Sequence, residues 1–350
     1  MGKILGLGLT HYPGLAYQGD LAGRIKKYRF DPDLPEHYRE PSGWPDKMRE
    51  EWADDEGKAH AEKHRQDLID NMRWARQQLD DFKPDVVLVW GDDQYENFRE
   101  DVVPPFSVLA YDGFDVTPWN GHRFTATNYW NEPKEKEFHF NGHHTAGKYL
   151  ATRLLEDGFE VAYAYKPHHD VMPHAFLNTA LYLDWDRKGF PYPILPFAVN
   201  CYGRGLVKLR GSVLNKLADA PNGEDMDPPS AQPYRCFDVG GAVARAMAAS
   251  PWRVALVGSS SWSHNFLTSK FQYVHGDVES DKRYYKALVE GDFDFWRKTP
   301  LADVEASGHH ELLNWFCLVG AMAELKRKPD ESRFLESWLC NSSKVFAVFK

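Results

Sequence analysis

Short apolar runs recur along the 350-residue chain, and several of them stop abruptly at histidine, acid or amide side chains. One such run, "DVVLVW", leads directly into Gly91, Asp92, Asp93 and Gln94. Apolar runs of about four to eight residues between turn signals are typical of buried strands. We therefore predict strands at residues 3–9, 85–90, 159–165, 192–200, 253–258 and 344–349.

Amphipathic stretches alternate with these runs. Residues 57–82 place apolar side chains at helical spacing, and residues 142–157, 238–249 and about 284–330 also have helical patterns. Alternating strands and helices favour an α/β fold, in which helices flank a central, mostly buried sheet. The chain has no linker long enough to divide it, so we expect one domain over residues 1–350.

Two stretches depart from this alternation and are expected to be insertions. Residues 17–56 are rich in charged residues, proline and tryptophan. Residues 211–234 contain "ADAPNGEDMDPPSAQP", whose proline, glycine and aspartate content is typical of turns. We expect this second stretch to form a loop or a lid.

Composition narrows the classes of protein that this chain can be. The formal net charge is −9 and no basic block stands out, which argues against a nucleic-acid partner. No apolar run reaches the roughly 20 residues needed to span a bilayer. The N-terminus predicts a strand and not a signal peptide, and the four cysteines show no paired spacing. These features predict a reduced, cytoplasmic protein without membrane contact.

Polar side chains follow four of the predicted strands. They are His11, the run from Asp92 to Gln94, the pair His168 and His169, and His264. In open α/β sheets, ligands bind outside the carboxyl ends of the strands. We therefore expect these groups to meet in one crevice. The alternative for each histidine is a local hydrogen bond that caps a strand or a helix.

Two further candidates lie in predicted helices. In "SGHHELLNW", Glu311 occupies the first turn of a helix, where an acid is also favourable for the helix dipole. His60 and His64 lie four residues apart on one helix face, a spacing that can chelate a metal. His64 falls on the apolar stripe, so it either faces the crevice or makes a hydrogen bond near the start of the helix.

Seven segments in a fixed order resemble the class III extradiol ring-cleavage dioxygenases, the superfamily of the protocatechuate 4,5-dioxygenase catalytic subunit. The resemblance implies a non-heme Fe(II) enzyme of aromatic compound catabolism, which opens a catechol or aminophenol type ring with O₂. It also implies a homodimer, or a complex with a small partner subunit. The segments are "LGLTHYPGL", "PDVVLVWGDDQYENF", "HHDVMPHAFLN", "PYPILPFAVN", "VALVGSSSWSHNF", "SGHHELLNWF" and "NSSKVFAVF".

The resemblance also implies roles for individual residues. By position in the matching segments, His11 would be the first metal ligand and Glu311 the carboxylate ligand. His264 would be the acid-base histidine. His168, five residues before a proline, would be a further catalytic histidine, with His169 as its rival.

The second metal ligand is where the sequence departs from the family. The family has Asn-Asp-His after the second strand, whereas this chain has Asp92-Asp93-Gln94. Gln94 therefore stands in the place of a histidine, and it, Asp93 or His64 would complete the metal site. Imidazole suits Fe(II) better than an amide does, so two alternatives stay open. One is a non-oxidative enzyme that uses zinc or another divalent metal, and the other is a non-catalytic binding protein on the same fold.

Overall fold

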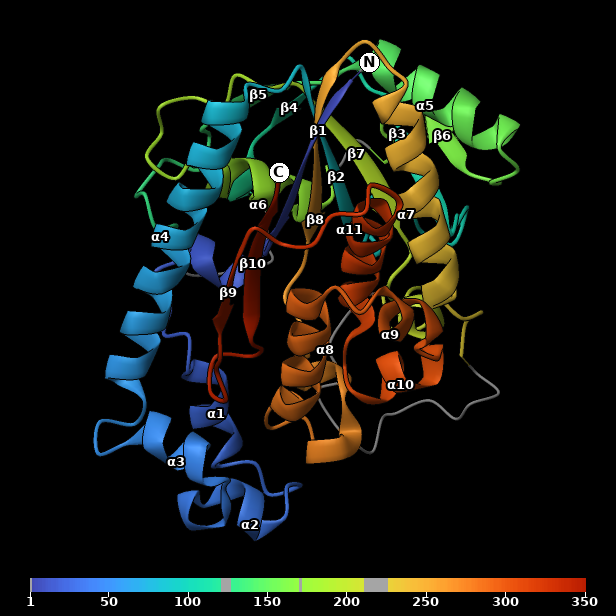
Figure 1. Cartoon of the computed structure of the whole chain (residues 1–350). Helices are drawn as coiled ribbons and strands as arrows, with labels where there is room; N and C mark the ends of the chain where they lie inside the picture. Colours follow the sequence, from blue (N-terminus) through green and yellow to red (C-terminus); the bar gives the residue numbers. More distant parts are fainter. Residues whose placement is uncertain (1, 121–126, 170–171, 211–225) are drawn as a thin grey trace.

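A single sheet of eight strands forms the centre of the molecule (Figure 1). The computed structural model describes residues 2–120, 127–169, 172–210 and 226–350. Across the sheet the strand order is β6-β3-β7-β2-β8-β1-β10-β9. The strands are β1 (Lys3–Leu9), β2 (Val86–Asp92), β3 (Phe106–Leu109), β6 (Ala162–Ala164), β7 (Ile194–Val199), β8 (Arg253–Ser259), β9 (Glu331–Leu335) and β10 (Lys344–Phe349).

Strand direction decides which strand ends lie side by side. The four central strands β7, β2, β8 and β1 are parallel to one another. Leu9 pairs with Ser259 and Asp92 pairs with Val199, so these four strands end at the same edge of the sheet. Strand β3 is antiparallel to β7, and β6 is parallel to β3. Strand β6 therefore runs opposite to the central four.

Helices cover both faces of the sheet, which confirms the predicted α/β class. Helices α4 (Lys58–Phe82) and α6 (His174–Leu183) pack on one face. Helices α5 (His144–Glu156), α7 (Pro233–Ala248) and α11 (Leu313–Glu324) pack on the other. Figure 1 shows α4 and α7 on opposite sides of the strands. The central strands are almost wholly buried, because helices cover them on both sides.

Helices α7 and α11 approach each other at two glycines. A Cβ atom on Gly240 would lie 1.8 Å from the carbonyl oxygen of Cys317. A Cβ atom on Gly320 would lie 1.9 Å from the carbonyl oxygen of Phe237. Only glycine fits at this crossing, and the close contact sets how deeply α11 lies against the sheet.

The remaining elements surround this core. Helices α1 (Gly23–Tyr28), α2 (Glu36–Arg39) and α3 (Asp46–Trp52) fall in the expected insertion at 17–56 and gather at one end of the molecule (Figure 1). They share a hydrophobic cluster with Trp338 and Leu339. A two-stranded sheet pairs β4 with β5, and three helices precede α11. These elements are β4 (Gly113–Val116), β5 (Phe138–Asn141), α8 (Val278–Glu290), α9 (Phe293–Lys298) and α10 (Leu301–Ala306).

The described residues do not decide two of the expectations from the sequence. Most of the expected lid, residues 211–225, lies outside them. The division into one domain with insertions stays a prediction. Within the described ranges, no helix is both long enough and apolar enough to cross a membrane.

Candidate active site

Three central strands deliver polar side chains to one edge of the sheet. His11 follows β1 by two residues, Asp92 is the last residue of β2, and His264 follows β8. All three side chains are buried, although each is polar. Burial of an ionisable group is costly unless a partner or a metal compensates it, so this edge is a candidate site.

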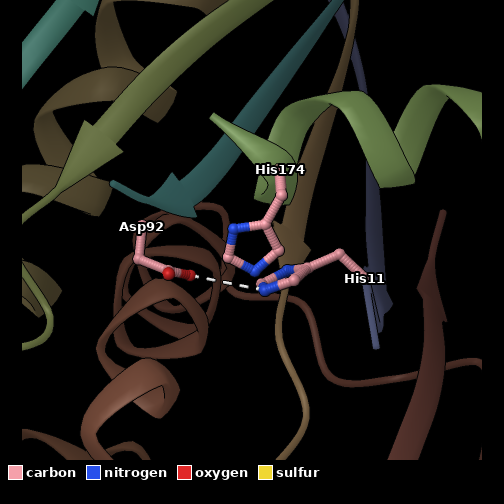
Figure 2. Close-up of side chains that lie close together, drawn as sticks. All are labelled: His11, Asp92 and His174. Atoms are coloured by element: carbon pink, nitrogen blue, oxygen red, sulfur yellow. Dashed lines mark ion pairs between the residues drawn. The ribbon is translucent and has the colours of Figure 1, made fainter. Parts of the chain in front are cut away.

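Helix α6 adds a fourth group, His174, at its first residue. Glu96 accepts hydrogen bonds from the backbone N–H of His174 at 3.1 Å and from its Nδ1 at 3.0 Å. The carboxylate thus caps the helix and fixes the imidazole ring. The other ring nitrogen then lies on the side of His11 and Asp92 (Figure 2). His11, Asp92 and His174 each offer a ligand atom, and these atoms all lie within 4.8 Å of one another.

A chain of hydroxyl groups fixes the tautomer of His11. Thr179 donates its hydroxyl hydrogen to the carbonyl oxygen of Ala175, so Ser259 must donate to Thr179. Ser259 can then only accept from Nδ1 of His11, which lies 3.1 Å away. Nε2 therefore carries the lone pair of neutral His11 and points away from the strand. Orientation by a hydrogen bond at the other nitrogen is what metal-binding histidines usually show.

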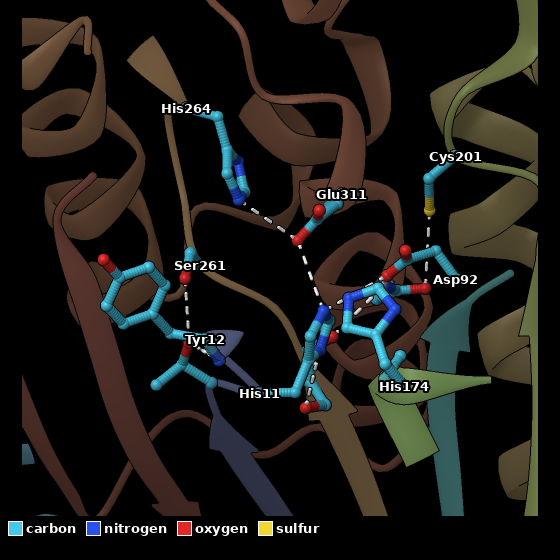
Figure 3. A network of polar contacts seen from close by, with 12 residues as sticks. His11, Tyr12, Asp92, His174, Cys201, Ser261, His264 and Glu311 are labelled. Carbon is cyan, nitrogen blue, oxygen red and sulfur yellow. Dashed lines mark hydrogen bonds and ion pairs between the residues drawn. The ribbon is translucent and has the colours of Figure 1, made fainter. Parts of the chain in front are cut away.

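Glu311 completes the arrangement from the short turn that precedes α11. Its Oε2 lies 3.5 Å from Nε2 of His11 and 3.3 Å from Nε2 of His264. Oδ1 of Asp92 lies 3.5 Å from the same His11 nitrogen. Figure 3 shows Glu311 between the two imidazoles and Asp92 on the far side of His11. Nε2 of His11 thus faces two buried carboxylates.

Burial and charge shift the protonation of these groups. Burial lowers the pKa of His11, but the charges of Asp92 and Glu311 outweigh burial and raise it. Burial and the neighbouring Glu311 raise the pKa of Asp92 to about 6. Burial opposes ionisation of Glu311, yet His264 and His11 hold the pKa of this carboxyl well below its usual range. For His264, burial lowers the pKa and keeps the ring neutral.

A buried network ties the segment of His264 to the segment of Glu311. Asp281 accepts hydrogen bonds from the backbone N–H and the hydroxyl of Ser263, at 3.0 and 2.8 Å. Nε2 of His309 lies 2.8 Å from the same carboxylate. The backbone N–H of His264 donates to the carbonyl of Gly308 at 2.9 Å. Because Ser263 bonds to an acid and not to a histidine, this network positions the site and does not form a serine nucleophile.

The donor set fits a divalent metal ion. Nε2 of His11 and Oδ2 of Asp92 are buried, and neither has a hydrogen-bond partner among the described residues. Bonds of about 2.0–2.2 Å to a metal place neighbouring ligand atoms on the order of 3 Å apart, close to the 3.5 Å separations around His11. Imidazole and carboxylate ligands suit iron, zinc and other first-row metals.

The adjacent residues Asp92, Asp93 and Gln94 occupy different environments. The carboxylate of Asp93 accepts backbone hydrogen bonds from Glu96, Asn97 and Phe98, at 2.8 to 3.2 Å, and thus closes the turn after β2. Gln94 is buried one residue further along. Asp92 is the member of this run whose carboxylate faces His11. Asp93 is thus engaged in the turn, whereas the assignment of Gln94 as a metal ligand stays a prediction.

His64 is not among the residues whose ligand atoms gather around His11 in the described part of the chain, and its role as a ligand stays a prediction. It is buried in α4, where its ring stacks on His60 with centroids 5.9 Å apart. His60 in turn contacts Ser337 and Glu51, at 3.1 Å each. Burial, followed by the charge of Lys344, holds the pKa of His64 well below its usual value. The positive charge of the buried Lys344 side chain therefore disfavours a metal cation at His64.

His168 also lies apart from His11. The expectation that its strand would end beside the other three is wrong, because β6 runs in the opposite direction at the far side of β3. The imidazole contacts Asp101, and its side chain is 47% exposed. His168, His169 and Asp101 form a separate group.

Three groups of the site were not assigned from the sequence: Asp92, His174 and Tyr202. Asp92 lies at the strand end beside the two residues that the resemblance favours, and His174 directly follows Pro173, the proline by which the resemblance selects His168. Tyr202 follows β7 and donates a hydrogen bond to Glu311 at 2.6 Å. Its position just after β7, the fourth central strand, is the sequence signal from which Tyr202 could have been predicted.

Comparison with known proteins finds a family match over part of the chain. Residues 227–347 match the family described as the catalytic LigB subunit of aromatic ring-opening dioxygenase, and they include His264 and Glu311. This part of the chain is similar to the class III extradiol ring-cleavage dioxygenases. The resemblance seen in the sequence is thereby confirmed.

Two similar proteins carry dioxygenase names. The chain is 22% identical over 269 residues to a 2,3-dihydroxyphenylpropionate/2,3-dihydroxicinnamic acid 1,2-dioxygenase of Photorhabdus laumondii. The aligned region covers 73% of this chain and 70% of that protein. The chain is 27% identical over 167 residues to a second such dioxygenase, from Pseudomonas putida. This aligned region covers 45% of this chain and 46% of that protein. These extradiol relatives support an oxygenase of the LigB family.

Proposed function

We propose that the protein is a metal-dependent extradiol dioxygenase that opens the ring of a catechol or an aminophenol with O₂. The observation that carries this proposal is the position of His11 Nε2 between two buried carboxylates, with His264 on the other side of Glu311. The relatives named as dioxygenases of 2,3-dihydroxyphenylpropionate support the same reaction class.

His11, Asp92, His174 and Glu311 would hold the metal in this proposal. Two imidazoles and a carboxylate are the usual ligands of non-heme Fe(II) in oxygenases. His174 supplies the second imidazole that Gln94 does not, and it comes from α6 instead of the end of β2. When bound, Fe(II) would supply the one-electron chemistry that allows O₂ to react with an aromatic diol.

His264 would move protons in the reaction. Burial keeps its ring neutral, so one ring nitrogen is able to accept a proton from a substrate hydroxyl. The adjacent negative charge of Glu311, 3.3 Å away, stabilises the imidazolium that results. The same ring then returns the proton to the product. Tyr202 and Ser259 would keep Glu311 and His11 oriented during these steps.

The test is anaerobic purification with metal quantification, followed by O₂ uptake on a panel of catechols and aminophenols. The panel includes 2,3-dihydroxyphenylpropionate because two relatives are named for it. We expect O₂ consumption that depends on added Fe(II). Tight zinc binding without O₂ uptake would favour the non-oxidative enzyme. Ligand binding without metal or turnover would favour the non-catalytic protein.

A second experiment tests the donor set itself. We expect Asp92→Ala and His174→Ala to weaken Fe(II) and Zn²⁺ binding at least about tenfold, because each removes a ligand. Gln94→Ala and His64→Ala are the matched controls and should retain the metal. Loss of metal in only one of the two control variants would move the ligand to that residue and contradict the proposed set.

A further inference from the structure

We infer that Asp101, His168 and His169 form a second divalent-metal site, distinct from the one around His11. Each of these three residues offers a ligand atom, and the three atoms lie within 4.8 Å of one another. Nε2 of His169 lies 3.1 Å from Oδ2 of Asp101, and Nε2 of His168 contacts the same oxygen. Two imidazoles and one carboxylate make a ligand set that holds zinc in proteins.

The backbone under this group is held in place. The side-chain oxygen of Asn97 accepts hydrogen bonds from the backbone N–H of His168 at 2.6 Å and of His169 at 3.2 Å. Asn97 itself is buried, and its own N–H is bonded to Asp93. One fixed amide group thus sets two adjacent histidines side by side, so that both rings reach one carboxylate. A preorganised backbone lowers the entropic cost of binding a metal.

The environment of Nε2 of His169 supports the inference that a ligand binds here. Nε2 of His169 is shielded from solvent and has no hydrogen-bond partner among the described residues, although Asp101 lies beside it. A metal between the rings would bind this nitrogen in its deprotonated form, with water at the remaining positions. His168 and Asp101 are 47% and 40% exposed, so an ion reaches the group directly from solvent.

The second site shares its chain segments with the first. Residues 96–101 contact three histidines: Glu96 contacts His174, Asn97 contacts the N–H groups of His168 and His169, and Asp101 contacts the rings of the same two residues. A metal at Asp101 would strengthen the outermost of these contacts. A surface ion would therefore help to hold the segment that presents His174.

Zinc titration of the metal-free protein tests the inference. With Zn²⁺ as the only probe, calorimetry should resolve two binding events for the wild-type chain. Asp101→Asn and the double variant His168→Ala/His169→Ala should each lose one event, and Asp92→Ala should lose the other. His139→Ala is the matched control, since His139 is an exposed histidine for which the described residues supply one acid partner, Asp115, at 2.8 Å. An unchanged number of events in the Asp101 and double variants would overturn the inference.

A second measurement uses the unmodified sequence, so it does not depend on how any variant folds. Diethyl pyrocarbonate modifies accessible imidazoles, and peptide mapping locates the modified rings. Zn²⁺ should protect His168 and leave His139 reactive. Equal reactivity of His168 with and without Zn²⁺ would also overturn the inference. Neither measurement depends on dioxygenase activity, so its outcome is separate from that of the proposed function.

Discussion

Tyr202 donates its hydroxyl hydrogen to Oε1 of Glu311 over 2.6 Å, and both side chains are buried. This bond leaves Oε2 of the carboxylate to face His11 and His264. The end of β7 therefore sets the rotation of a proposed metal ligand that lies on a different element, more than a hundred residues away in the chain.

Removal of this hydroxyl should loosen the metal. Tyr202→Phe keeps the buried ring but frees the carboxylate to rotate, and loss of such a supporting contact typically costs about 10–100-fold in metal affinity. We expect a loss of that size in Fe(II) or Zn²⁺ titrations, with an unchanged circular dichroism spectrum. Tyr149→Phe is the control, because the hydroxyl of Tyr149 donates to the carbonyl of Ala246 at 3.2 Å and not to a residue of the proposed site. Equal affinities in the two variants would contradict the role of Tyr202.

Substitution of His264 should separate proton transfer from metal binding. His264→Ala should retain the metal, because His11, Asp92 and His174 remain in place. It should lose at least roughly a hundredfold in kcat, the usual scale for general acid-base catalysis. Metal content and kcat are measured on the same preparation. If metal and rate disappear together, His264 is a ligand and the proposed role is wrong.

The two adjacent glycines of α7 should respond in opposite directions to the same substitution. Gly240→Ala places a methyl group 1.8 Å from the carbonyl oxygen of Cys317, so the helices must separate. Such overpacking typically costs about 1–3 kcal/mol. Gly241→Ala meets only ordinary contacts, the nearest at 3.5 Å, and should gain up to about 1 kcal/mol from helix propensity. Urea unfolding of both variants measures the difference, and similar stabilities would show that α7 and α11 can move apart freely.

Lys344 should make stability rise with pH in alkaline solution. Its side chain is fully buried, its Nζ donates to the carbonyls of Cys340 and Ser342, and burial lowers its pKa to about 8 from 10.5. Between these two values the unfolded chain retains the proton and the folded chain has lost it. The free energy of unfolding therefore rises with pH across this window, by on the order of 2–3 kcal/mol for this group.

Lys344→Met isolates this contribution from other groups that titrate in the same range. Denaturant unfolding at pH 8 and pH 10 should show a smaller rise in the variant than in the wild-type protein. The comparison uses the difference between the two rises, because the variant also loses two hydrogen bonds at every pH. Parallel stability curves for the two proteins would show that Lys344 is charged in the folded state throughout.

Local sequence patterns were sufficient for much of the sheet. The apolar runs at residues 3–9 and 344–349 coincide with β1 and β10, and residues 57–82 match α4 almost to the residue. Long, strongly apolar or strongly periodic segments carry their own signal. Strands β3, β4, β5 and β9 were not predicted. They have only four or five residues each, too few to show a period, and long-range pairing creates them.

By itself, the sequence determined that polar groups would end the central strands and that His11, His264 and Glu311 would lie among them. Only the tertiary structure decided which neighbours join them. Asp92, Asp93 and Gln94 are adjacent in sequence, but the path of the turn aims one carboxylate at His11 and uses the next to bind backbone N–H groups. The direction of β6 removes His168 from the site, and the start of α6 brings in His174. Each outcome depends on strand direction and helix placement, which are set by contacts between distant parts of the chain.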